Sequence, residues 1–117
     1  ERTNTPSQAL LLLNEREYLK AARKLALQAL GPQDASAIQR LAFVYETVTS
    51  KLPDAREQEV LAALIENLHE KYLATPSLAD DICSGMTLPD TGKKAQLAAW
   101  TVLVNTLYNL DITKTRE

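Results

Sequence analysis

The sequence predicts an all-α fold, a compact bundle of about five to six mostly antiparallel helices. Apolar residues recur at intervals of three and four through most of the chain, which is the spacing of one helix face. Glycines number only 3 and aromatic residues make up 5 % of the chain, whereas strands and their turns are usually rich in both. Proline and glycine interrupt the apolar pattern briefly, so the connections are short and neighbouring helices should run antiparallel.

The composition is that of one globular domain. The chain has 117 residues, of which 45 % are hydrophobic and 24 % are charged. Thirteen basic and fifteen acidic side chains give a net charge of -2, which argues against a nucleic-acid surface built on bulk charge. The apolar runs fall far short of the roughly 20 residues that a membrane-spanning helix needs. We therefore expect a single helical domain over residues 1–117, without a membrane span or a nucleic-acid partner.

A capping box predicts the start of the first helix. The Thr5 hydroxyl can accept a hydrogen bond from the backbone of Gln8, and the Gln8 side chain can accept one from the backbone of Thr5. Pro6 stands at the first helical position, where its missing N–H costs little. This helix carries apolar residues to position 13, and Asn14 then caps a second helix over residues 15–30.

Proline and glycine separate the central helices. Gly31-Pro32 ends the helix over residues 15–30, and Asp34 is the expected N-cap of the next, which Pro53 ends. Asp54 and Glu57 predict a second capping box, at the start of a helix that continues to about residue 74. The residues expected to face the core are Tyr18, Leu19, Ala22, Leu25, Ala26, Ala29 and Leu30, then Ile38, Leu41, Tyr45, Val48 and Leu52, then Leu61, Leu64, Ile65, Leu68 and Tyr72.

Two helices complete the predicted bundle. A break at Thr75-Pro76 precedes a short helix over residues 77–84, and residues 86–92 form a loop. The last helix runs from about residue 93 to residue 109, and Trp100 lies on its broad apolar face. Such a face is typical of a helix that packs between others. We expect the polar residues 112–117 to fray.

The sequence predicts no catalytic, metal or cofactor site within these residues. Glu66 and His69 have the spacing of half a di-iron site, but that site needs two such motifs and His69 is the only histidine. A solvated helix edge is the favoured interpretation. Cys83, the only cysteine, has no base beside it in sequence and is expected to be a small buried residue.

Two features could be interfaces. Arg16, Lys20, Arg23 and Lys24 form a basic stripe that could meet phosphate or an anionic polysaccharide, although a solvated face is the favoured interpretation. Phe43 points away from the apolar stripe of its helix. We expect another helix to cover it, and the alternative is that it docks on a domain outside this chain.

Motifs at both ends of the chain, with several residues between them, form a wider pattern. Its members are Thr5, Pro6, Gln8 and Asn14 within the opening segment 2–14, Tyr18, Arg23, Arg40, Pro53 and Glu57 in the middle, and Trp100 and Asn109 within the closing segment 98–117. In this pattern the chain resembles the C-terminal domain of unknown function of the large planctomycete cytochrome-c-domain (PSD-type) proteins.

The resemblance has implications for the parent protein. It implies that residues 1–117 are the C-terminal segment of a much larger, exported protein, located in the periplasm or outside the cell. No signal-peptide pattern occurs in this segment itself. Haem is implied only for a Cys-x-x-Cys-His module elsewhere in such proteins, and their implied role is in the breakdown of complex polysaccharides.

Three functions are compatible with these observations. The leading hypothesis is a non-catalytic domain that packs on, or scaffolds, the upstream domains of its parent. The second is part of an enzyme site completed by upstream residues, in which Asn4, Gln8, Arg16 or Arg40 binds a sugar or an anion. The third is a stand-alone adaptor that binds a partner helix. The sequence leaves the oligomeric state open.

Overall fold

The computed structural model describes residues 19–32, 34–83 and 91–116, and these residues form five helices and no strand. A helix over residues 19–30 comes first, and the others are α2 (Ala37–Thr49), α3 (Ala55–Ala74), α4 (Pro76–Cys83) and α5 (Thr91–Arg116). The all-α class is confirmed. The predicted first helix, with its capping residues Thr5, Pro6, Gln8 and Asn14, lies outside the described residues.

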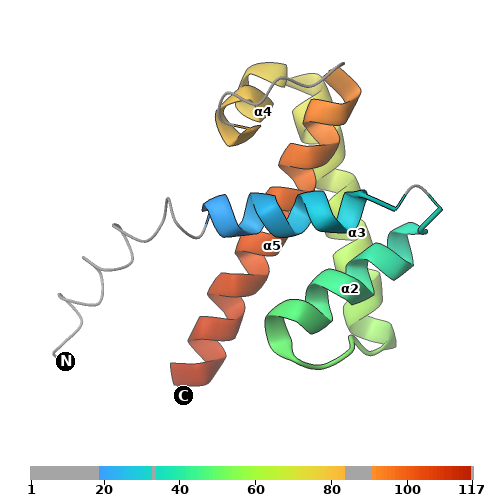
Figure 1. Cartoon of the computed structure of the whole chain (residues 1–117), viewed down its shortest axis with the longest axis vertical. Coiled ribbons are helices and arrows are strands. Elements are labelled where there is room, and N and C mark those ends of the chain that lie inside the picture. The colour runs from blue at the N-terminus through green and yellow to red at the C-terminus, as the bar shows by residue number, and fades with distance from the viewer. Residues whose placement is uncertain (1–18, 33, 84–90, 117) are drawn as a thin grey trace, which may run out of the picture.

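The longest helix, α5, is the centre of the bundle. It contacts α2, α3 and α4, and it runs antiparallel to α3 along much of its length (Figure 1). The short α4 packs beside the first turns of α5, while the helix over residues 19–30 crosses α5 at a steep angle. The chain is therefore a bundle in which one helix lies across the antiparallel pair.

Burial around α5 explains its central place. Its buried side chains lie on more than one face, and alanines among them allow neighbouring helices to approach closely. These buried residues are Ala95, Leu97, Ala98, Ala99, Trp100, Thr101, Leu103, Val104 and Leu107. The predicted packing of this helix between others is confirmed.

The start of α2 differs from the prediction. Its N-cap is Ser36, not Asp34. The Ser36 hydroxyl accepts from the Gln39 backbone N–H at 3.1 Å, and Gln39 Oε1 accepts from the Ser36 N–H at 2.8 Å. Asp34 has Ala37 three residues later, which cannot return a hydrogen bond, so the reciprocal pair places the helix start at Ser36.

The end of α2 is also earlier than predicted. The helix stops at Thr49, and Ser50 takes the left-handed conformation with φ 68°. A residue before proline disfavours helical backbone, which keeps Leu52 out of the helix. Leu52 is 63 % exposed and Ile38 is 57 % exposed, so both were wrongly assigned to the core.

The remaining helix ends are close to the predictions, with two corrections. The Asp54–Glu57 capping box at the start of α3 is confirmed, with hydrogen bonds of 2.8 and 2.9 Å. The next helix, α4, begins one residue early, at Pro76, a position that proline tolerates. The last helix, α5, continues to Arg116 instead of ending at residue 109. No glycine or proline follows position 109 to stop it.

Candidate functional site

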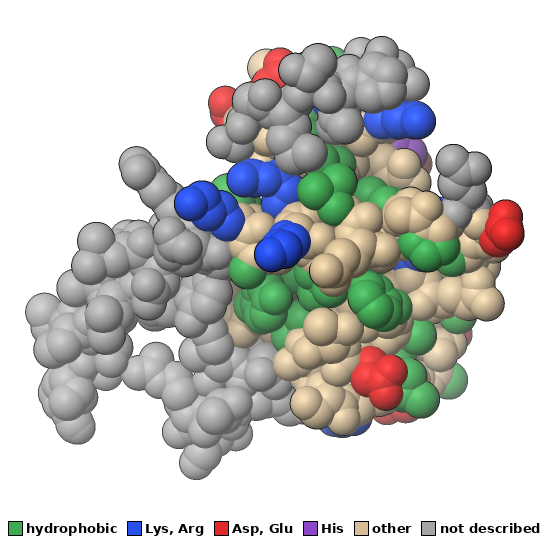
Figure 2. All heavy atoms as spheres, viewed as in Figure 1, with side chains coloured by type: hydrophobic (Ala, Val, Ile, Leu, Met, Phe, Trp, Pro, Cys, Tyr) green, Lys and Arg blue, Asp and Glu red, His purple; other side chains and the backbone are tan. Residues whose placement is uncertain are grey.

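The predicted basic stripe separates into residues with different surroundings. Lys20 and Lys24 are exposed, and Figure 2 shows lysine and arginine side chains gathered near the start of the helix over residues 19–30. Arg23 is half-buried and turns toward α4. Arg16 lies outside the described residues. Of the three members of the stripe that the structure describes, the two lysines form a solvated surface and Arg23 does not.

Arg23 connects two helices that are far apart in sequence. Its Nη1 donates to the carbonyl oxygen of Ile82 at 3.1 Å, in the last turn of α4. Carbonyls at the end of a helix have no partner within that helix, and a positive charge there also interacts favourably with the helix dipole. This contact holds α4 against the helix over residues 19–30, which is called the first helix below.

Arg40 makes a similar contact at the end of the helix over residues 19–30. From α2, its Nε donates to the carbonyl oxygen of Ala29 at 3.2 Å, and its Nη2 donates to that of Pro32 at 2.8 Å. One guanidinium thus secures both the last turn of the first helix and the connection that follows it. The side chain is partly buried as a result.

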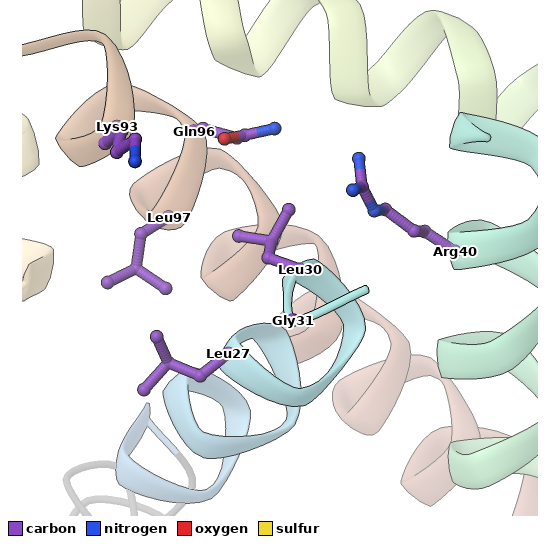
Figure 3. Close-up of a pocket in the computed structure, with 7 residues that line it drawn as sticks. All are labelled: Leu27, Leu30, Gly31, Arg40, Lys93, Gln96 and Leu97. Carbon is purple, nitrogen blue, oxygen red and sulfur yellow. The ribbon is translucent and has the colours of Figure 1, made fainter. Parts of the chain in front are cut away.

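A hollow of about 400 Å³ lies beside Arg40. Three helices supply its walls, because residues of the first helix, α2 and the start of α5 meet there (Figure 3). Its lining residues are Leu27, Leu30, Gly31, Arg40, Lys93, Gln96 and Leu97. The described part of this lining therefore combines leucines with the basic side chains of Arg40 and Lys93 and the amide of Gln96.

Phe43 lines a smaller groove, and Arg40 is among the residues that line it as well. The groove has a volume of about 180 Å³, and Pro32, Ala35 and Ala29 are among its lining residues. Phe43 remains 42 % exposed. The expectation that a neighbouring helix buries it was wrong, because the groove stays open where the first helix ends and the chain turns into α2.

Cys83 is buried, as the sequence predicted. It is 1 % exposed, and its thiol donates to the carbonyl oxygen of Lys94 at 3.6 Å. Burial raises the pKa of the Cys83 thiol, and the positive charges of Lys94 and Arg23 offset this only in part. At neutral pH the side chain is thus a neutral thiol that packs between α4 and α5.

An ion pair also connects α4 and α5, near Cys83. Lys94 Nζ lies 2.8 Å from Asp80 Oδ1, and this hydrogen bond with the carboxylate charge raises the pKa of Lys94. Both side chains are substantially exposed, so the pair adds little to stability. Asp80 therefore serves as a partner of Lys94.

The weak metal motif lies on α3, where Glu66 is exposed and His69 is half-buried. Across the described residues, no group of three or more His, Cys, Asp or Glu side chains is arranged to hold a metal ion. Within the same residues, no helix is long and apolar enough to cross a membrane.

Two other residues of the predicted pattern lie on α5. Trp100 is 4 % exposed and belongs to the core, whereas Asn109 is exposed near the end of the helix. Trp100 therefore has a structural role in the packing of the bundle.

Sequence reasoning missed the residues of α5 that complete the hollow beside Arg40. Lys93 and Gln96 are three residues apart, which places them on one face of a helix. That polar pair beside the apolar stripe of α5 was a detectable sign of a mixed surface. Its proximity to Arg40 was not detectable, because it depends on how three helices pack.

Comparison with known families identifies the chain. The model of the family described as "PSD1: Protein of unknown function (DUF1553)" matches residues 1–65, which is more than half of the 117 residues. The chain belongs to the PSD1 (DUF1553) family. No curated protein and no solved structure matches it.

The match to the PSD1 family covers only part of the hollow. Residues 1–65 include the first helix and α2, and therefore Leu27, Leu30 and Arg40. Lys93, Gln96 and Leu97 come from α5, beyond the matched residues. The hollow thus joins the matched and unmatched parts of the chain.

Proposed function

We propose that this chain is a non-catalytic helical scaffold and interaction domain at the C-terminus of a larger exported protein of the planctomycete cytochrome-c-domain type. The parent would take part in the breakdown of complex polysaccharides and would carry haem in an upstream module. Membership of the PSD1 family supports a domain of this kind. The sequence motifs at the two ends of the chain support the parent.

The contacts of the two arginines carry this proposal. Arg23 and Arg40 belong to the predicted interface set, and both donate to carbonyl oxygens at or just after helix ends. Such bonds to neutral carbonyls fix the relative positions of helices. The side chains of Arg23 and Arg40 therefore connect helices, which is what a scaffold domain requires.

Phe43 marks the surface through which the scaffold would contact the rest of the parent. An aromatic side chain beside a proline and alanines offers apolar area with few rotatable bonds, which is typical of residues at protein interfaces. The upstream domains of the parent are the proposed partner.

The test uses the full-length parent protein. We expect Phe43→Ser to separate the thermal unfolding of this domain from that of the upstream domains, because their contact is weakened. Val60→Ser on α3 is the matched control, since Val60 is 59 % exposed and lies outside the groove. Polysaccharide turnover per folded molecule should be unchanged in both variants.

The alternative of an enzyme site makes the opposite prediction. If Gln8→Ala or Phe43→Ser abolished turnover while the unfolding transitions stayed unchanged, the scaffold proposal would fail. The gene upstream of residue 1 provides an independent test. A signal peptide and a Cys-x-x-Cys-His motif there would support the parent, and their absence from the full-length gene would contradict it.

A further inference from the structure

We propose that the hollow between the first helix, α2 and α5 binds a small organic carboxylate. The Arg40 guanidinium and the Gln96 amide would hold the carboxylate, and Leu27, Leu30 and Leu97 would contact its apolar body. This binding site goes beyond the scaffold function and does not depend on the identity of the parent protein.

The guanidinium of Arg40 has donors left for a ligand. Of its five N–H groups, one on Nε and one on Nη2 bind the carbonyls of Ala29 and Pro32. Among the described residues, no carboxylate is paired with Arg40. The terminal nitrogens therefore keep the fork of N–H groups that matches the two oxygens of a carboxylate.

The bonds to Ala29 and Pro32 also prepare Arg40 for binding. They hold the guanidinium in place from one side, so a ligand need not immobilise a long, flexible side chain. Reducing that entropic cost is a general way in which a preorganised group increases affinity. The structural role of Arg40 and its proposed binding role are therefore compatible.

Gln96 approaches the same space from another helix. Figure 3 shows its amide group pointing across the hollow in the direction of Arg40. Within the described part of the chain, the Gln96 side chain makes no hydrogen bond. Its NH₂ group is thus able to donate to an oxygen placed between the two helices.

The charges around the hollow favour an anion. Among the described residues that line the hollow, Arg40 carries a positive charge with donors left for a ligand, Lys93 is also basic, and none is acidic. A positive potential between apolar walls is concentrated, because the walls have a low dielectric constant. An uncharged ligand would gain nothing from this positive potential.

The leucines and the volume define the rest of the ligand. Leu27 is 41 % exposed and Leu30 is half-buried, so a ligand can cover apolar surface there, whereas Leu97 is buried at the wall. The volume of about 400 Å³ is near the lower end of the roughly 300–1,000 Å³ that is usual for ligand pockets. A small molecule with a short hydrocarbon or aromatic body fits these dimensions.

The test is a titration of the 117-residue chain with sodium benzoate, followed by amide chemical shifts in nuclear magnetic resonance spectra. Benzamide removes the charge, acetate removes the apolar body, and inorganic phosphate provides a different anion. With benzoate, we expect saturable chemical-shift changes at Leu27, Arg40 and Gln96. The other three compounds should bind at least about tenfold more weakly, because each lacks either the charge-assisted hydrogen bond or the apolar contact.

Variants of Gln96 and Leu27 test the location. Gln96→Glu places a negative charge opposite Arg40 and should weaken benzoate binding about tenfold or more. Gln58→Glu is the matched control on α3, because it makes the same change of charge outside the hollow. It should bind benzoate as tightly as the unsubstituted chain does. Leu27→Ala removes apolar wall at a partly exposed position, where the fold tolerates the change.

Several results would overturn the proposal. These are no saturable shift with benzoate, equal binding of benzoate and benzamide, or binding of phosphate as strong as that of benzoate. Equal affinities of Gln96→Glu and Gln58→Glu would place the site elsewhere. If Gln96→Glu did not fold, unchanged benzoate affinity in folded Leu27→Ala would be the decisive contrary result.

Discussion

Thr101 offers a sharp test of how the core of this protein is built. It lies on α5 with 0 % of its surface exposed, and its hydroxyl has no hydrogen-bond partner among the described residues. A buried polar group without a partner has lost its hydrogen bonds to water and gained none in the fold. We expect Thr101→Val to stabilise the protein.

The magnitude follows from the lost solvation of the hydroxyl. An unsatisfied buried polar group costs about 1–3 kcal/mol, and valine replaces the hydroxyl with a methyl of similar size. Part of that gain will be offset by small adjustments of packing around the methyl. The expected increase in the free energy of unfolding is therefore about 1 kcal/mol, or a rise of about 3–5 °C in the melting temperature of a domain of this size.

Thr106→Val is the matched control on the same helix. Thr106 is half-buried, and its hydroxyl donates to the carbonyl oxygen of Val102 at 2.8 Å. Both substitutions exchange one β-branched residue for another, so their effects on the backbone are alike. Thermal and urea unfolding followed by circular dichroism should show a stabilised Thr101→Val and an unchanged or weakened Thr106→Val. The reasoning is wrong if Thr101→Val is the less stable variant.

Three other predictions concern stability and pH. Arg40→Met should lower the free energy of unfolding by about 1–3 kcal/mol, because the carbonyls of Ala29 and Pro32 lose their donors; an unchanged urea midpoint would contradict that role. Ser36→Ala should cost about 0.5–2 kcal/mol in the same assay through loss of the α2 cap, and an effect below that range would show that the cap is dispensable. Because the pKa of Cys83 is raised in the fold, its contribution to stability is fully present below the ordinary thiol pKa of about 8.5 and is lost as the pH rises toward the higher value. As the pH rises through this alkaline range, the urea midpoint should therefore fall more steeply for the unsubstituted chain than for Cys83→Ala. Equal slopes of urea midpoint against pH would be evidence against a raised pKa of Cys83.

Local chemistry in the sequence was enough to predict most of the helices. The spacing of apolar residues identified α3 and its inward residues Leu61, Ile65 and Tyr72, which are buried. The Asp54–Glu57 pair fixed the start of α3, because its hydrogen bonds join residues only three positions apart. Interactions of this range are present in the sequence itself.

Periodicity was less reliable for deciding which apolar residues are buried. Ile38 and Leu52 continue the apolar stripe of Leu41 and Tyr45, yet both are exposed. A stripe shows which side of a helix can be covered, whereas the length of the neighbouring helices and the end of α2 at Thr49 decide how far the cover extends.

The sequence by itself determined the helical class, most helix positions, the burial of Cys83 and Trp100, and the family motifs. Only the tertiary structure decided that Arg23 binds a carbonyl 59 residues away and that Arg40 binds one 11 residues away. It also decided that Arg40 and Gln96 face one hollow and that Phe43 remains open to solvent. The physical reason is that periodicity and capping act within a few residues, whereas a shared surface depends on the crossing angles of helices that are distant in sequence.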